Sequence, residues 1–337
     1  MSDNSKGTPR IAVIGLGNWG TALAHCLSQQ VGSVLAWTKD FAVRDSIRKH
    51  SLNIPYKIPH ELDRGIHVVN TIDETLGSQI VFLALPARVI SHIAPLLRTL
   101  DRDAILVSAS KGFDPETCET PLQVLTRLLP EHPRRVVVSG PSFSADVLRG
   151  LPAALVAGTL DPFAARAVAD LFSGTSLRVY TSDDPLGVEL GGILKNVIAI
   201  AAGVSDGLGL GDSARAAVIT RGLAEMRPFC AAAGAKAETI FGLSGLGDLI
   251  MTASSAQSRN RTVGFRLGQG ESLESITKSL GSVAEGISTV FRVMELATSY
   301  RVSMPICAEM EKIISGTASP SDTLQNLLRR PYRPEFS

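Results

Sequence analysis

Three glycines set between a short apolar segment and a helical one constrain the fold more than any other feature of this chain. Residues 10–14, RIAVI, have the length and composition of a buried strand, and TALAHCLSQQ from Thr21 onward has helical spacing. Between them lie residues 15–20, GLGNWG, which match GxGxxG in the required order of strand, turn and helix. The first glycine permits a tight turn, the second lets a pyrophosphate approach the backbone, and the third allows close packing of helix on strand. We therefore expect this turn to bind a dinucleotide, through Gly15, Gly17, Asn18, Trp19 and Gly20.

Apolar segments alternate with helical patterns over the first half of the chain. The further expected strands are short and rich in apolar residues, and they are 33–37, 66–70, 80–85, 104–108, 135–139, 153–157 and 177–180. Helical patterns lie between them, notably at 88–100, 116–129 and 162–172. This alternation predicts a mostly parallel sheet covered by helices on both faces. Beyond residue 187 only helical patterns remain, so we expect an α/β Rossmann-type domain over 1–186 and an all-α C-terminal domain over 187–337.

Composition excludes several classes of function. The chain has 337 residues, a formal net charge of +1 and 45% hydrophobic residues, which favours a globular protein without affinity for nucleic acid. No apolar run is expected to reach the roughly 18 residues of a membrane span, and residues 1–10 lack the apolar core of a secretory signal, so we predict no membrane insertion. The four cysteines, Cys26, Cys118, Cys230 and Cys307, are widely spaced. Their spacing indicates no metal site and fits a reducing, cytoplasmic location.

The end of the second expected strand bears on the choice of cofactor. An NAD-preferring site usually has an acidic residue there, to bind the ribose hydroxyls. Here Thr38 and Lys39 come before Asp40, and Arg44 is close by. Lys39 either meets a 2′-phosphate or is an exposed loop lysine, so we expect NAD(H) or NADP(H) as the cofactor.

Ligands in such sheets bind beyond the carboxyl ends of the strands. Lys111 follows one expected strand, next to Gly112, and is either a site residue or a solvated loop cation. The next strand ends in residues 139–144, SGPSFS, whose small residues and hydroxyls resemble an anion-binding nest before a helix. The sequence therefore places candidate anion-binding groups at the same edge as the glycine turn.

Lys195 is the one lysine in a long apolar helical pattern, residues 187–204, GVELGGILKNVIAIAAGV. One interpretation is a lysine whose stem lies along the core while its ammonium reaches water. The other is a lysine held in a partly desolvated cleft, where burial lowers its pKa toward that of a general base. Its place where the two expected domains meet favours the second interpretation.

Two later segments carry further candidate ligands. Asp248 follows the glycines of residues 242–247, GLSGLG, and lies four residues before Thr252, on the same face of a helix. The alternative for Asp248 is a simple helix cap. Residues 258–261, SRNR, open another helical pattern and form either a phosphate site or a surface basic cluster.

Taken together, these segments resemble the bacterial-type NAD(P)-dependent glycerol-3-phosphate dehydrogenases over nearly the whole chain. The matching segments are 15–20, 110–112, 140–143, 194–196, 245–249, 258–261 and 283–286. The resemblance implies a Rossmann domain followed by a helical domain. It also implies reversible oxidation of sn-glycerol 3-phosphate to dihydroxyacetone phosphate, an activity that in bacteria supplies the backbone of membrane phospholipids.

The resemblance also implies a role for individual residues. Lys195 matches the proton acceptor, and Lys111 and Asp248 complete the catalytic set. The substrate-binding positions are Lys111, Gly140, Ser142, Lys195, Asp248, Thr252, Ser258, Arg259 and Asn260. The cofactor-binding positions implied by the resemblance are Trp19, Lys39, Lys111, Ser144, Arg259, Val283 and Glu285. Two residues depart from the family pattern: Ser144 stands where alanine is common, and Lys39 where histidine or arginine is often found.

Two other functions share many of these features. A 3-hydroxyacid dehydrogenase also has a lysine on the first helix after its Rossmann domain, but usually lacks the 258–261 segment. A nucleotide-sensing protein that has lost its chemistry would not need Lys195, Lys111 and Asp248. Loss of NAD(P)H absorbance that depends on dihydroxyacetone phosphate distinguishes all three. A homodimer is expected, because dimers are common for this fold.

Overall fold

The computed structural model describes residues 9–280, 284–331 and 334 of the chain. By internal contacts the chain divides into two compact units, Met1–Glu189 and Leu190–Ser337, and each is described by itself. Most of the expected N-terminal lead-in and the cofactor candidate Val283 lie outside the described residues.

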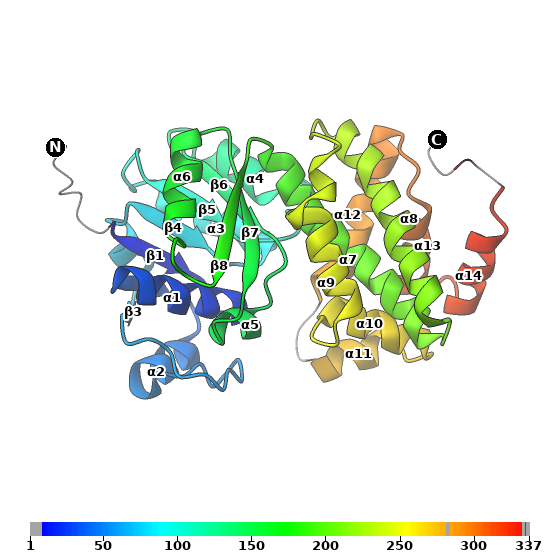
Figure 1. Cartoon of the computed structure of the whole chain (residues 1–337), viewed down its shortest axis with the longest axis horizontal. Coiled ribbons are helices and arrows are strands. Elements are labelled where there is room, and N and C mark those ends of the chain that lie inside the picture. Colours follow the sequence, from blue (N-terminus) through cyan, green and yellow to red (C-terminus); the bar gives the residue numbers. More distant parts are fainter. Residues whose placement is uncertain (1–8, 281–283, 332–333, 335–337) are drawn as a thin grey trace. The chain divides into compact units, whose positions relative to one another are not determined.

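An eight-stranded sheet forms the centre of the first unit (Figure 1). Its strands are β1 (Ile11–Ile14), β2 (Val34–Trp37), β3 (Ile66–Val68), β4 (Ile80–Leu83), β5 (Ile105–Ser108), β6 (Arg135–Ser139), β7 (Ala153–Gly158) and β8 (Leu177–Ser182). Their order is β3-β2-β1-β4-β5-β6-β7-β8, and β6 with β7 is the one antiparallel pair in this sheet. The mostly parallel sheet expected from the alternating pattern is therefore confirmed.

Helices of the first unit cover the two faces of this sheet. They are α1 (Asn18–Val31), α2 (Phe41–His50), α3 (Ala87–Ile93), α4 (Pro121–Leu128), α5 (Ser144–Leu148) and α6 (Pro162–Asp170). The strands β2 and β3 lie on one side of β1 in the sheet, and β4 and the later strands lie on its other side. Because crossovers between parallel strands are right-handed, α1 lies on one face of the sheet, and α3 and α4 lie on the other. Burial on both faces explains why β1 and β4 consist only of apolar residues, without the alternation of apolar and polar residues found in a strand with one face in water.

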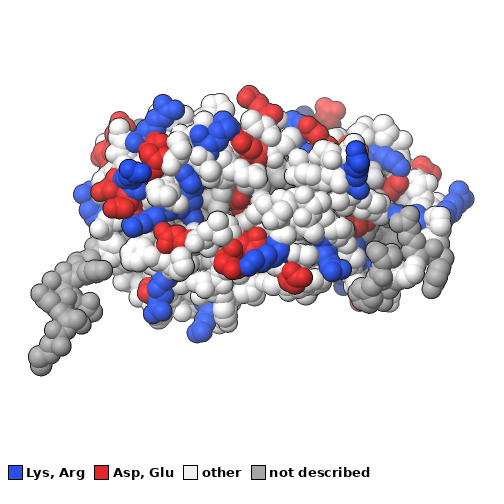
Figure 2. Space-filling view, turned by 90° about the horizontal axis from the view of Figure 1, so that it is seen from above, with Lys and Arg blue, Asp and Glu red and all other residues white. Residues whose placement is uncertain are grey.

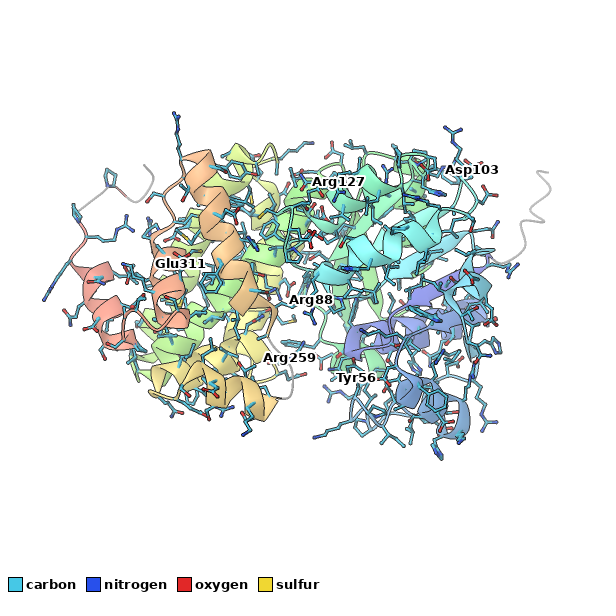
Figure 3. The ribbon with its side chains drawn as sticks, turned by 180° about the vertical axis from the view of Figure 1, so that it is seen from behind. Tyr56, Arg88, Asp103, Arg127, Arg259 and Glu311 are labelled. Atoms are coloured by element: carbon cyan, nitrogen blue, oxygen red, sulfur yellow. The ribbon has the colours of Figure 1, made fainter. Side chains whose placement is uncertain are left out.

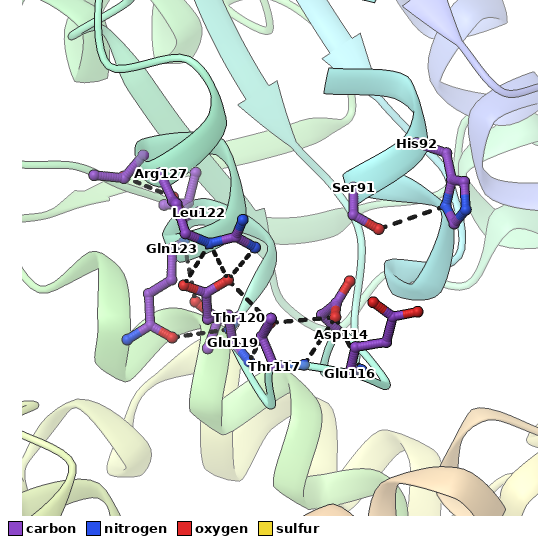
Figure 4. Close-up of polar contacts among 11 residues, drawn as sticks. Ser91, His92, Asp114, Glu116, Thr117, Glu119, Thr120, Leu122, Gln123 and Arg127 are labelled. Atoms are coloured by element: carbon purple, nitrogen blue, oxygen red, sulfur yellow. Dashed lines mark hydrogen bonds and ion pairs between the residues drawn. The ribbon is translucent and has the colours of Figure 1, made fainter. Parts of the chain in front are cut away.

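Two helix predictions are wrong at their ends. The pattern at 88–100 gives α3 only to Ile93, followed by a short 3-10 helix at Ala94–Leu97, because Pro95 cannot donate the next helical hydrogen bond. The helix expected at 116–129 begins at Pro121, five residues later than expected. Thr120 caps α4 through the amide of Gln123, and the Gln123 side chain accepts from the Thr120 amide at 2.9 Å (Figure 4).

A buried carboxylate meets this capped end of α4. Glu189 is 3% exposed; its Oε2 accepts from the Thr120 hydroxyl at 2.5 Å and its Oε1 from the Leu122 amide at 2.9 Å. Burial raises the pKa of Glu189 to about 7, against the two hydrogen bonds, which lower it. The protonated form of this acid is therefore favoured by the folded state.

The Glu189 carboxyl should make the stability of the protein depend on pH. Because its pKa is raised on folding, its contribution is fully present below about pH 4.5 and is lost as pH rises through about 7. We expect Glu189→Gln to remove this loss, at most about 3 kcal/mol of unfolding free energy. Urea unfolding of wild type and variant at pH 5 and pH 8 measures the difference, with exposed Glu116→Gln as the control. An identical pH dependence in wild type and Glu189→Gln would contradict the expectation.

Helices alone make up the described part of the second unit, so the expected all-α domain is confirmed in class. They are α7 (Pro185–Gly207, which begins in the first unit), α8 (Gly211–Ala232), α9 (Asp248–Ser254), α10 (Arg259–Gly268), α11 (Leu273–Leu280), α12 (Glu285–Tyr300), α13 (Pro305–Ile314) and α14 (Pro320–Leu328). The expectation that no segment has the length of a membrane span is wrong for α7. By length and composition this helix could cross a membrane, but its apolar window is wholly buried, as in the core helix of a globular protein.

Candidate active site

The glycine turn after β1 leaves no room for a side chain at its first and third glycines. Gly15 has φ +101°, and a β-carbon on it would lie 2.4 Å from the carbonyl oxygen of Ala84. A β-carbon on Gly20 would lie 1.8 Å from the carbonyl oxygen of Gly15. Both contacts are with backbone atoms, which cannot move aside cheaply. The turn is therefore built as the sequence pattern predicts.

The start of α1 faces this turn without a side-chain cap. Its N-cap is Gly17, which has no side chain to occupy the helix amides, and these amides suit the anionic pyrophosphate of a dinucleotide. The cradle left by the glycines and the uncapped helix start fit such a cofactor.

Two residues that the sequence did not single out support the turn. The buried Asn53 donates from Nδ2 to the Leu16 carbonyl oxygen at 2.9 Å and to the Thr21 hydroxyl at 2.8 Å. Tyr56 lies over Gly17, since a β-carbon there would be 3.6 Å from its Cε1. No local pattern marks either residue, because both come from the irregular segment after α2.

The parallel strands bring the other candidates of this unit to one edge. The carboxyl ends of β1, β2, β5 and β6 lead into Gly15, Lys39, Lys111 and Gly140, respectively. Lys39 is exposed, whereas the Asp40 carboxylate caps α2, accepting from the amides of Ala42 at 2.9 Å and Val43 at 3.3 Å. The carboxylate at the end of β2 is therefore occupied as the N-cap of α2.

The segment after β6 is a tight turn. Gly140 has φ +150°, and the Ser142 hydroxyl donates to the Gly140 carbonyl oxygen at 3.1 Å. Ser144 is the first residue of the short helix α5. The role of this turn in binding an anion stays a prediction.

Lys195, Asp248 and Thr252 form a buried polar cluster in the second unit. Lys195 Nζ donates to Asp248 Oδ1 at 2.9 Å and lies 2.7 Å from Thr252 Oγ1. The Thr252 hydroxyl also lies 3.1 Å from Asp248 Oδ1, so one turn of α9 presents both groups to α7. Lys195 is 6% exposed, Thr252 3% and Asp248 0%. The interpretation of Lys195 as a lysine that reaches bulk water is therefore wrong, and Asp248 is more than a helix cap.

A second chain of hydrogen bonds lies beside this cluster. Asn260 donates from Nδ2 to Asn196 Oδ1 at 2.8 Å, and its Oδ1 accepts from the Gly286 amide at 3.1 Å. Asn196 is 2% exposed, and its Nδ2 has no hydrogen-bond partner within the described part of the chain. Asn196 was not among the predicted site residues. Its place directly after Lys195 was the signal that could have found it.

The remaining candidates of this unit lie at helix starts. Ser258 caps α10, its hydroxyl accepting from the Arg261 amide at 3.2 Å, and the exposed Arg259 is the first residue of that helix (Figure 3). Glu285 is the first residue of α12. On the face drawn in Figure 2, charges of both signs are interspersed. The described residues include no cluster of three or more His, Cys, Asp or Glu side chains able to hold a metal ion.

Models of two protein domains match this chain. Residues 10–165 match the N-terminal domain of NAD-dependent glycerol-3-phosphate dehydrogenase, and residues 184–325 match its C-terminal domain. The chain belongs to the NAD-dependent glycerol-3-phosphate dehydrogenase family. The family resemblance drawn from the sequence motifs is thus confirmed.

Individual members of the glycerol-3-phosphate dehydrogenase family match over nearly their full length. The chain is 40% identical to the glycerol-3-phosphate dehydrogenase [NAD(P)+] of Thioalkalivibrio sulfidiphilus, covering 97% of this chain and 99% of the relative. It is 43% identical to that of Acidithiobacillus ferrooxidans, with 97% and 95% covered. The crystal structure of glycerol-3-phosphate dehydrogenase from Coxiella burnetii superposes with a TM-score of 0.90 at 31% identity, covering 96% of this chain and 99% of that one.

Proposed function

We propose that this protein catalyses the reversible oxidation of sn-glycerol 3-phosphate to dihydroxyacetone phosphate with NAD(H) or NADP(H), and that Lys195 moves the proton of the C2 hydroxyl. The observation that carries the role of Lys195 is its geometry. Its Nζ is buried and lies 2.9 Å from the Asp248 carboxylate and 2.7 Å from the Thr252 hydroxyl. An amine fixed in this way has a defined position from which to exchange a proton with a substrate oxygen.

We assign cofactor binding to the domain of residues 1–186. The turn of Gly15, Gly17 and Gly20 and the uncapped start of α1 bind the pyrophosphate, with Asn18 and Trp19 in the same turn. Further cofactor contacts are assigned to Lys39, Lys111 and Ser144 in this domain, and to Arg259, Val283 and Glu285 in the domain of residues 187–337. When bound, the nicotinamide accepts or supplies the hydride at C2 of the substrate.

We assign most of the chemistry to the domain of residues 187–337. In the oxidation direction, neutral Lys195 takes the proton of the C2 hydroxyl, and in reduction its ammonium returns a proton to the carbonyl oxygen. Asp248 and Thr252 orient Nζ through their hydrogen bonds. Lys111 adds positive charge that stabilises the developing alkoxide. Ser258, Arg259 and Asn260 hold the phosphate, with Gly140 and Ser142 as further substrate ligands, and we add the Nδ2 donor of Asn196 to this set.

Turnover of dihydroxyacetone phosphate tests this proposal directly. Loss of NADH or NADPH absorbance should require dihydroxyacetone phosphate and should not occur with 3-keto acids. Turnover of the 3-keto acids instead would support a 3-hydroxyacid dehydrogenase. Cofactor binding without turnover of either substrate would indicate a nucleotide-binding protein without this activity.

Lys39 should influence the choice between the two cofactors. Since the Asp40 carboxylate caps α2, Lys39 is the charged group at the end of β2 that suits a 2′-phosphate. We expect Lys39→Asp to lower kcat/KM for NADPH about tenfold relative to that for NADH, a change of about 1.4 kcal/mol in discrimination. Steady-state kinetics with both cofactors provide the measurement, with exposed Lys49→Asp on α2 as the control. An unchanged ratio of the two kcat/KM values in Lys39→Asp would show that this lysine does not discriminate between NADPH and NADH.

The wider setting is also part of the proposal. Supply of sn-glycerol 3-phosphate for glycerophospholipid synthesis in the cytoplasm fits the activity of the family. A homodimer is proposed because it is common for this fold. Sedimentation equilibrium of the purified chain distinguishes a dimer from a monomer.

A further inference from the structure

The two arginines of residues 258–261 have different surroundings. Arg259 is exposed at the start of α10, whereas Arg261 directs its guanidinium to Asp206, near the end of α7. Arg261 Nε and Nη2 donate to Asp206 Oδ2 at 2.9 and 2.6 Å. The other oxygen of Asp206 accepts from Arg215 Nη1, on α8, at 2.9 Å. The Asp206 carboxylate, whose side chain is 7% exposed, therefore joins α10 and α8 to α7.

Close backbone packing holds α10 along α7 in one register. A β-carbon on Gly264 would lie 1.9 Å from the Ile200 carbonyl oxygen, and one on Gly203 would lie 2.2 Å from the Arg261 carbonyl oxygen. The Asn196–Asn260 hydrogen bond follows the same sequence offset as the Ile200–Gly264 contact, 64 residues. The two helices thus run parallel, with the first turn of α10 next to the turn of α7 that carries Lys195.

We propose that Asp206 is a positioning residue for the substrate. By holding Arg261, it fixes the first turn of α10, and with it Asn260 against Asn196. This inference rests on the proposed binding of the substrate phosphate by Arg259 and Asn260. Arg261 then acts through the position of its helix and is not itself a phosphate ligand.

The physical basis is the short length of α10. The helix has ten residues, so its first turn depends on the Ser258 cap, the Asn260 hydrogen bonds and the Arg261 ion pair. Loss of the ion pair allows Arg259 and Asn260 to shift together. Misplacement of binding groups by about 1 Å can cost on the order of 100-fold in catalysis. Binding of the cofactor to the glycine turn does not depend on this ion pair.

A set of matched variants tests the inference by steady-state kinetics of the full-length enzyme. We expect Asp206→Asn and Arg261→Met each to raise KM for dihydroxyacetone phosphate at least about tenfold. KM for NADH should rise clearly less, because the glycine turn that binds the pyrophosphate is unchanged and Arg259 is only one of the assigned cofactor contacts. The double variant should be no worse than either single variant, because both remove the same interaction. Arg215→Met is the control: the same carboxylate loses a partner, but α10 keeps its ion pair, so KM should stay within about twofold of wild type. Arg261→Lys, which keeps the charge, should raise KM less than Arg261→Met and covers the case in which Arg261→Met does not fold.

Three results would overturn the inference. An unchanged or lowered KM in Asp206→Asn would mean that Arg261 binds substrate directly or that its position is irrelevant. An equal rise of this KM in Arg215→Met would mean that the ion pairs of Asp206 have only a general structural role. Additive effects in the double variant would mean that Asp206 and Arg261 act independently. Failure of the wild-type enzyme to reduce dihydroxyacetone phosphate would instead overturn the proposed function, so the two failures are distinguishable.

Discussion

Replacement of Lys195 by methionine is expected to lower kcat by about three orders of magnitude, within the range lost when a general acid–base group is removed. Methionine keeps the apolar stem that packs in α7 but has no proton to exchange with the substrate oxygen. Binding of NADH should persist, because the glycine turn and α1 lie in the other unit. Steady-state turnover of dihydroxyacetone phosphate and a fluorescence titration with NADH measure the two quantities separately.

Stability must be controlled in this experiment. Without Lys195, the Asp248 carboxylate is left 0% exposed and without its cation. Breaking a buried ion pair in this way typically costs about 3–5 kcal/mol. The double variant Lys195→Met with Asp248→Asn removes the buried negative charge that has lost its cation. It should be more stable than the single variant while remaining inactive. Exposed Lys49→Met controls for the loss of a lysine, and near-native turnover in a folded Lys195→Met enzyme would exclude the proposed proton transfer.

Substitution of Gly20 by alanine is expected to weaken NADH binding by at least about 100-fold, equivalent to about 2.7 kcal/mol. The new β-carbon would lie 1.8 Å from the Gly15 carbonyl oxygen, so the turn that receives the pyrophosphate must change shape. Titration of NADH fluorescence measures the loss. Gly77→Ala is the matched control in the same unit, because its β-carbon would meet the flexible end of Arg10 at 3.2 Å.

Gly17→Ala covers the case in which Gly20→Ala does not fold. Its β-carbon would make only an ordinary contact with Tyr56, at 3.6 Å, so the fold should tolerate it. It would nevertheless add a methyl group where the pyrophosphate approaches the backbone. NADH affinity equal to wild type in both folded variants would show that the cofactor binds elsewhere.

Much of the fold could be predicted from local patterns. Uninterrupted apolar runs such as β1 and β4 are typical of strands buried on both faces, and all eight strands occur where they were expected. Helix ends were less predictable. The start of α4 depends on a capping box at Thr120, a polar interaction that apolar periodicity does not report.

The candidate site was predictable in its residue types and only partly in its contacts. The four-residue spacing of Asp248 and Thr252 placed them on one helix face, and residues 258–261 were expected to open a helix, which α10 does with Ser258 as its N-cap. The partners of Lys195 lie 53 and 57 residues away in the chain, and those of Asn53 lie 37 and 32 residues away. No periodicity links such distant positions.

The amino-acid sequence alone therefore established the glycine turn, the two classes of domain and the family, because turn chemistry, the period of apolar residues and motif order are properties of the linear chain. Tertiary structure decided which polar groups meet. Only the packing of α7 against α9 and α10 places Lys195 on Asp248 and Asp206 on Arg261. Only burial in the folded protein raises the pKa of Glu189 to about 7. The physical reason is that a hydrogen bond or a desolvated charge depends on which surfaces come together in space, and that information is spread over segments far apart in the chain.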